Sequence, residues 1–265
     1  MFVWLWMLGC AAFPGKTNDV FDIEIRYQGW TPSDAEYEAI NQARLRWQSV
    51  LTSDIPDEYV QVEQEAVDAL GTTPCFAMNQ NVDDLLVHIS IDDSHPTPFV
   101  SHICTRREDS PFYTSVGGIW LGNSALEGGS VFDQLEDAVV HEIGHVLGLR
   151  ASGWNLDIDG DGIWERNLLP EMSECGTTQI HYVGPYANGV FQDMGGVGQI
   201  PMEDVGQPGT ACEHWDNVTL NGEVMTGYSG STPRALSAIT VAAIEELGYD
   251  VNIGQAEYYE LPAVP

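Results

Sequence analysis

The stretch from His141 to Leu149 constrains this chain more than any other part of its sequence. It reads His-Glu-Ile-Gly-His-Val-Leu-Gly-Leu. Residues four apart on an α-helix share a face, so His141 and His145 would project together, with Glu142 one step around the helix. One turn would then supply two metal ligands and a base, as in zinc hydrolases. The alternative is that both histidines are buried and satisfy local hydrogen bonds.

The residues around this motif predict the helix that it requires. Asp133 followed three residues later by Glu136 is the pattern of a capping box, and Gly148 is suited to end a helix. The apolar positions between these signals would pack around the polar stripe: Leu135, Val139, Val140, Ile143, Val146 and Leu147.

The composition indicates a globular protein that carries a large negative charge. A chain of 265 residues with 43% hydrophobic residues can bury a substantial core, as one domain with two lobes or as two small domains. It has 9 Lys and Arg residues against 40 Asp and Glu residues, a net charge of −31. Such a charge repels phosphate backbones and anionic lipid headgroups, so we expect no nucleic-acid partner. Cations are the natural partners of this surface.

Residues 1–13 form a short apolar run that is too short to span a membrane. They are typical of the hydrophobic part of an export signal. Leu8-Gly9-Cys10 also resembles the end of a bacterial lipoprotein signal, in which Cys10 would carry a lipid anchor; a plain signal peptide is the alternative. Either predicts a protein outside the cytoplasm, secreted or anchored to a membrane.

The remaining cysteines are an even set of four, suited to two disulfides in an oxidising compartment. Four cysteines allow three pairings. We favour Cys75 with Cys104 and Cys175 with Cys212, because each pair then closes a loop on one side of the zinc helix.

Hydrophobic periodicity predicts an α+β fold in which strands and a helix precede the zinc helix. In zinc proteases, an edge strand just before the zinc helix can bind the substrate as an added strand. We expect two lobes, 14–149 and 150–265, after the leader 1–13. The expected elements are strands at 21–27, 85–91 and 116–123, a helix at 31–51, an irregular segment at 52–84 and a loop at 92–111.

Other histidines before the motif have simpler interpretations. His88 lies among apolar neighbours and is interpreted as structural, whereas His95 and His102 lie in the predicted loop and are expected to face solvent.

An acidic, Gly-containing stretch follows the motif. Asp157, Asp159 and Asp161 alternate ahead of Gly162, as in a calcium loop, although Leu168 stands where an EF-hand has its closing glutamate. The alternative is an ordinary Asp-Gly turn. A bound calcium ion would brace the loop.

Catalytic zinc takes three protein ligands, so the two motif histidines need a partner. A compact metzincin would have its third histidine at position 151, which is Ala151 here. The candidates farther along are His181 and His214, with Glu171 and Glu174 available to a site of the two-His, one-Glu type.

The context of His214 resembles the leishmanolysin family of metzincin metalloproteases. Segments 200–206 and 209–215 end in Cys-Glu-His-Trp, and 221–227 reads Asn-Gly-Glu-Val-Met-Thr-Gly. That family interrupts its zinc motif with a long insertion and places the third histidine shortly before a Glu-x-Met-Thr turn. Segment 236–249 resembles the family's closing helix. The likeness runs from about Val116 to Ile253.

This resemblance implies roles for individual residues. His141, His145 and His214 would bind zinc, Glu142 would be the catalytic glutamate, and Met225 would be the methionine beneath the metal. It implies a metzincin-type zincin fold and a zinc endopeptidase acting on proteins or peptides. We expect the protein to be a monomer. A rival hypothesis is a catalytically silent, calcium-stabilised surface-binding lipoprotein.

Overall fold

The structure is a computed structural model that describes residues 20–69, 73–109, 111–151, 153–156, 165–169, 175–204, 206, 209–227 and 233–263. Predictions that concern other positions lie outside the described residues. These are the lipid anchor at Cys10, the calcium loop of Asp157, Asp159 and Asp161, and the alternative ligands Glu171 and Glu174.

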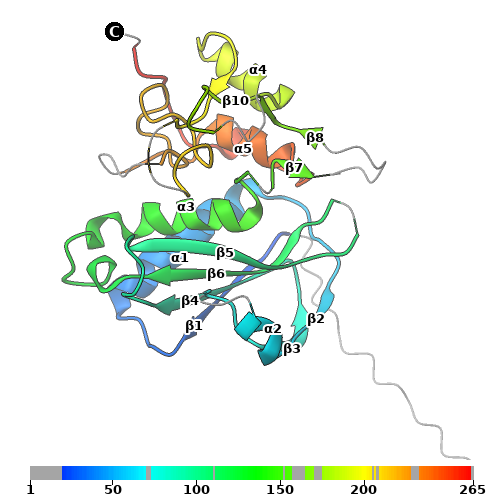
Figure 1. Ribbon diagram of the computed structural model, residues 1–265, viewed down its shortest axis with the longest axis vertical. Helices are drawn as coiled ribbons and strands as arrows, with labels where there is room; N and C mark the ends of the chain where they lie inside the picture. The colour runs from blue at the N-terminus through cyan, green and yellow to red at the C-terminus, as the bar shows by residue number, and fades with distance from the viewer. Residues whose placement is uncertain are drawn as a thin grey trace, which may run out of the picture.

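The N-terminal half is built on a four-stranded sheet, shown in the lower part of Figure 1. Its strands are β1 (Ile23–Gln28), β4 (Leu85–Ile91), β6 (Thr114–Leu121) and β5 (Phe99–Arg106), in that spatial order. β1, β4 and β6 are parallel, and β5 runs antiparallel to β6. The structure is a mixed α+β fold, as the sequence predicts.

The strands predicted at 21–27, 85–91 and 116–123 are confirmed, but two other predictions are wrong. The expected loop 92–111 contains β5, and the irregular segment 52–84 contains β2 (Glu58–Val62), α2 (Gln64–Ala69) and β3 (Met78–Val82). These strands have many polar or half-exposed positions, so their hydrophobic alternation is weak. In addition, the strand just before the zinc helix, β6, is interior, and β5 is the edge strand.

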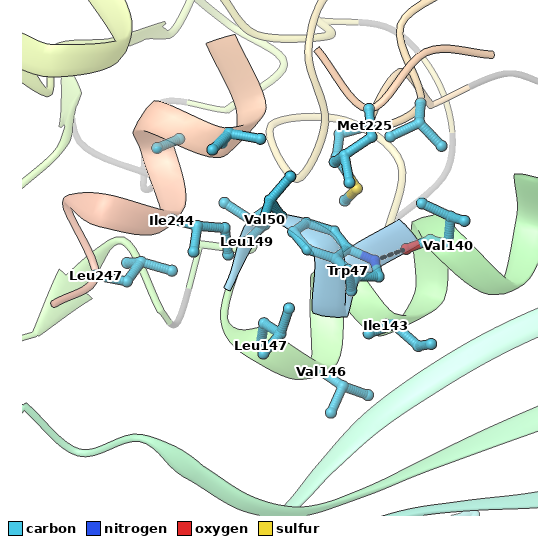
Figure 2. Close-up of a cluster of buried hydrophobic side chains, with 14 of the residues drawn as sticks. Trp47, Val50, Val140, Ile143, Val146, Leu147, Leu149, Met225, Ile244 and Leu247 are labelled. Carbon is cyan, nitrogen blue, oxygen red and sulfur yellow. Dashed lines mark hydrogen bonds between the residues drawn. The ribbon is translucent and has the colours of Figure 1, made fainter. Parts of the chain in front are cut away.

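Two helices pack on one face of this sheet. α1 (Asp34–Val50) begins at Ser33 with a capping box that includes Glu36, and α3 (Leu135–Leu147) is the predicted zinc helix. Figure 2 shows Trp47 of α1 donating its indole N–H to the carbonyl oxygen of Val140 on α3, at 2.8 Å. Since Trp47 is fully buried, this bond satisfies its polar atom inside the core and fixes the two helices relative to each other.

The start of α3 differs from the prediction. Asp133 and Glu136 do not form a capping box, because Phe132–Gln134 is a short 3-10 turn that leads directly into the helix. The N-cap is therefore Gln134, in a helical conformation and without a side-chain cap. The end is as predicted, since Gly148 is the C-cap with a φ of 121°, which a glycine adopts without strain.

The opposite face of the sheet is covered by the antiparallel pair of β2 and β3. Val60, Val82, Leu86 and Val116 form a small separate core there. The predicted disulfide between Cys75 and Cys104 is present and joins the loop before β3 to β5.

His88 also lies on this covered face. Its side chain is only 2% exposed and its ring meets that of Phe76 edge-on, so the structural interpretation is confirmed. Nearby, a Cβ on Gly118 would come within 2.1 Å of the Pro74 carbonyl oxygen, so only glycine lets this loop lie flat on the sheet.

The C-terminal half contains short strands and two helices around an aromatic core. Trp154, Tyr182 and Trp215 pack together in this core. The helices are α4 (Pro185–Asp193) and α5 (Ala238–Glu245), which lies within the predicted closing helix. The strands are β7 (Asn155–Leu156) with β8 (Glu165–Arg166), and β9 (Leu168–Leu169), β10 (His181–Tyr182) and β11 (Ile200–Pro201) in one antiparallel sheet.

The chain then returns to the first half. The backbone N–H of Asn252 donates to Val50 O at 2.7 Å, just before the short 3-10 turn Ile253–Gln255. Arg46 of α1 forms ion pairs of 2.7 Å with both Asp137 and Glu257. These contacts hold α1, α3 and the C-terminal segment together. None of the helices in the described part of the chain has the length and apolar character needed to cross a membrane.

Candidate metal centre

Three of the predicted histidines converge on one point. His141 and His145 come from α3, and His214 comes from the segment after β11. Their Nε2 atoms are separated by 3.0, 3.0 and 2.9 Å. All three side chains are buried, with exposed fractions of 8% or less.

The other ring nitrogen of each histidine is held by a backbone carbonyl oxygen. Nδ1 of His141 lies 2.7 Å from Val224 O, Nδ1 of His145 lies 2.7 Å from Leu149 O, and Nδ1 of His214 lies 2.8 Å from Thr210 O. A carbonyl oxygen only accepts hydrogen bonds, so each Nδ1 carries a proton. In a neutral ring, Nε2 then has a bare lone pair. Three such lone pairs face one another, and this is stable only with a cation between them.

These residues fit zinc. Nitrogen atoms 2.9–3.0 Å apart can each lie at the zinc–nitrogen distance of about 2.0–2.1 Å from a single ion. Burial lowers the pKa of His141 and His145 well below the usual value, and that of His214 to about 4. The rings are therefore neutral at pH 7, as metal ligands must be.

The segment that carries His214 is fixed by the two residues just before the histidine. The second predicted disulfide, Cys175 with Cys212, is present, and Cys212 has a left-handed φ of 62°. The carboxylate of Glu213 accepts a hydrogen bond of 2.8 Å from the backbone N–H of Ala151, the position where a compact motif would have its third histidine. These contacts bring a residue 69 positions away from His145 to its side.

Met225 lies against the zinc helix at Gly144. A Cβ on Gly144 would come within 2.6 Å of Met225 Sδ and 3.1 Å of the Trp47 ring, so a side chain at this position would displace the methionine. The preceding turn is braced by Glu223, which is fully buried. Its carboxylate accepts hydrogen bonds from the backbone N–H of Met225 at 2.5 Å and from the Thr240 hydroxyl at 2.5 Å.

Glu142 faces the edge strand. Its Oε2 accepts a hydrogen bond of 2.5 Å from the hydroxyl of Ser101 on β5. Burial raises the pKa of Glu142 to about 7, and the Ser101 hydrogen bond, followed by the charges of Arg150 and Arg234, opposes this rise. A buried carboxylate with one oxygen held is suited to exchange a proton through the other oxygen.

Comparison with known proteins agrees with this geometry. The family model described as leishmanolysin matches residues 83–261, more than half of the chain. The chain belongs to the leishmanolysin family. A relative in this comparison is the ciliated left-right organizer metallopeptidase of Xenopus laevis, 30% identical over 148 residues. The matched region is 46% of this chain but only 20% of that relative, so the chain spans a minor part of its length.

The leishmanolysin match begins at residue 83 and so includes the three histidines, Glu142 and Met225. Its members are zinc metalloproteases, which agrees with a buried cluster of three neutral imidazoles. The other histidines lie apart from this cluster. His181 is in β10 and His95 is exposed, whereas His102, expected to face solvent, is half-buried on β5.

Sequence reasoning missed three residues that support the leishmanolysin site: Ser101, Glu213 and Glu223. Ser101 was hidden because β5 was interpreted as a loop. Glu213 and Glu223 lie within the motifs that carry the family resemblance, so their acidic side chains were visible. Nothing in the sequence indicated which backbone groups they would hold.

Proposed function

We propose that this chain is a zinc-dependent endopeptidase that hydrolyses peptide bonds in proteins. The observation that carries the proposal is the meeting of three Nε2 atoms within 3.0 Å of one another, each ring having its Nδ1 at a backbone carbonyl oxygen. Buried acceptors that face one another without a donor cost free energy, and a cation between them would remove that cost. Membership of the leishmanolysin family supports zinc as the ion.

The chemistry divides between the ion and the chain's own residues. Zinc held by three imidazoles would supply a Lewis acid that polarises the scissile carbonyl and lowers the pKa of a water molecule to about 7. Glu142 would take the proton from the attacking water and pass it to the leaving amine. Ser101 would hold one carboxylate oxygen, so that the other faces the reacting atoms.

The substrate would lie along β5. This strand pairs with β6 on one side only and is one edge of the sheet, the edge beside α3. An extended peptide can add to such an edge through backbone hydrogen bonds. Because Ser101 joins β5 to Glu142, a peptide on this edge would pass the catalytic glutamate.

Several finer features belong to the same proposal. Met225 would be the methionine of a metzincin-type turn, with lobes 14–149 and 150–265 on the two sides of the metal centre. The two disulfides support a site of action outside the cytoplasm. Secretion or membrane anchoring, and a monomeric state, are further parts of the proposal. The candidate calcium loop of Asp157, Asp159 and Asp161 is tested by measuring calcium content alongside zinc.

The decisive test is the substitution Glu142→Gln. The purified variant should keep one zinc per chain and lose cleavage of casein, because only the proton acceptor is removed. His214→Ala should lose both zinc and activity. Cleavage by the Glu142→Gln protein, in a preparation free of other proteases, would overturn the role of Glu142.

The wild-type protein separates the endopeptidase from the rival hypothesis of a silent binding module. Chelator-sensitive cleavage of casein, restored by zinc, supports the endopeptidase. Zinc binding without cleavage of any protein substrate would support the binding module.

A further inference from the structure

Two arginines at one end of the zinc helix, Arg106 and Arg150, have no carboxylate partner among the residues that the structure describes. The chain carries a net charge of −31, so a basic residue has many carboxylates within reach. In the described part of the chain, the guanidinium groups of Arg106 and Arg150 have no hydrogen bond or ion pair. Among the other arginines whose side chains the structure describes, Arg26 lies beside Glu24, Arg44 beside Asp22, and Arg46 beside Asp137 and Glu257. Arg107 donates to backbone carbonyl oxygens, and Arg234 has no direct ion pair but lies within the electrostatic reach of Asp137 and Glu223.

Arg106 and Arg150 lie at the same end of the zinc helix. Arg106 is the last residue of β5, and it lines a small cavity together with Gly148 and Tyr249. Arg150 follows two residues after Gly148, and its backbone N–H donates to Gly148 O at 2.7 Å. Both arginines therefore lie where α3 and β5 end.

The positive charge of Arg150 reaches the metal centre. It contributes to lowering the pKa of His145 and His214, after the larger effect of burial, and it opposes the rise that burial causes in the pKa of Glu142. It also helps to lower the pKa of Arg106, which is half-buried. Two like charges without a counter-ion repel each other, and an anion between them would relieve that repulsion.

The direction of β5 decides which part of a substrate meets these arginines. Ser101 of β5 contacts Glu142, while Thr114, the partner of Arg106, donates its hydroxyl to Val146 O at 2.6 Å. β5 and α3 therefore run in the same direction. A peptide that pairs antiparallel to β5 runs in the opposite direction. Its residues on the N-terminal side of the scissile bond would lie toward Arg106.

We propose that Arg150, together with Arg106, binds the carboxylate of an Asp or Glu side chain on the N-terminal side of the scissile bond. The inference rests on the proposed endopeptidase function and names a substrate class for it, peptides with an acidic residue at that position. Guanidinium groups match carboxylates in charge and geometry. The remaining negative surface does not prevent this, since charges are screened beyond about 8 Å at physiological ionic strength.

Quenched fluorescent peptides with one Glu moved along the sequence, each paired with its Gln analogue, test the proposal. For the zinc-loaded wild-type protein, kcat/KM should be about 10- to 100-fold higher for Glu than for Gln at one position before the scissile bond. Arg150→Gln should reduce this ratio to near one, and Arg150→Glu should favour Lys over Gln at that position. Arg44→Gln, on the outer helix α1, is the control and should keep the wild-type ratio.

A Glu/Gln ratio near one in the wild-type protein, a ratio unchanged in Arg150→Gln, or an acidic preference only after the scissile bond would overturn the proposal. Thermal unfolding verifies that each variant is folded. If an Arg150 variant does not fold, Arg106→Gln takes its place in the experiment.

If the wild-type protein cleaves no peptide, the proposed endopeptidase function fails, and binding decides the inference separately. The same fluorescent peptides are then titrated with the Glu142→Gln protein and followed by anisotropy. The site is supported if Glu peptides bind more tightly than Gln peptides and if this difference disappears in the Glu142→Gln, Arg150→Gln double variant. Equal binding rejects it.

Discussion

Replacing Gly144 by alanine should destabilise the protein, although alanine is the better helix former. Gly144 lies inside α3, where glycine costs roughly 0.5–1 kcal/mol relative to alanine. The new Cβ would lie 2.6 Å from Met225 Sδ and 3.1 Å from Met225 Cε. Overpacking of this kind costs about 1–3 kcal/mol. Met225 is only 2% exposed and the Trp47 ring lies 3.1 Å from the same Cβ, so the end of the methionine has little room to move, and we expect a net loss of about 1–2 kcal/mol.

The assay is thermal unfolding of the zinc-loaded protein. For a chain of this size, a loss of about 1–2 kcal/mol lowers Tm by roughly 2–8 °C. Gly189→Ala is a matched control, because Gly189 is also inside a helix, α4, but a Cβ there has nothing within 4 Å. That variant should be more stable than wild type by roughly 0.5–1 kcal/mol.

A second substitution shows whether Met225 causes the loss. Met225→Ala removes the atoms that the new Cβ meets, so the double variant should be less destabilised than the sum of the two single variants. If Gly144→Ala raises Tm as Gly189→Ala does, or if the two effects at positions 144 and 225 simply add, the methionine does not pack against the zinc helix as described.

Three further predictions concern stability. The pKa of His88 is lowered to about 4, chiefly by burial and then by the charge of Arg26. As pH falls from about 6.5 toward 4, His88 is therefore protonated in the unfolded chain but not in the folded protein. About 2 kcal/mol of stability should be lost by pH 5. Urea unfolding at pH 7.5 and 5 should show that this part of the pH dependence disappears in His88→Phe. Replacing Cys175 and Cys212 by serine should cost about 4 kcal/mol, from a loop of 37 residues, and weaken zinc binding in a competition titration. Arg46→Met should cost about 3–5 kcal/mol in the same unfolding assay, because it removes the direct ion-pair partner of the buried Asp137; a loss below 1 kcal/mol would contradict the buried ion pair.

The elements with strong periodicity could be predicted from the sequence. α1 and α3 have continuous apolar faces, and β4 and β6 are almost entirely buried, so their patterns follow their environments. β5 escaped prediction because it lies at the edge, where half-buried positions accept polar residues. The two-residue strands of the C-terminal half are too short to give a pattern at all.

The residues of the metal centre also differ in how far the sequence alone predicts them. His141 and His145 follow from helical geometry alone, whereas His214 was selected through its resemblance to a family motif. The contact between Ser101 and Glu142 joins residues 41 positions apart, and no local pattern encodes it. Contacts of this kind depend on the arrangement of whole elements, which the sequence leaves open.

The central claim is that His141, His145 and His214 bind one zinc ion. X-ray absorption at the zinc edge, on protein with its metal content measured, tests this most directly. We predict one zinc per chain with three imidazole nitrogens at about 2.0–2.1 Å and a change of ligand set in His214→Ala. Sulfur ligands, or a spectrum unchanged by His214→Ala, would contradict the account.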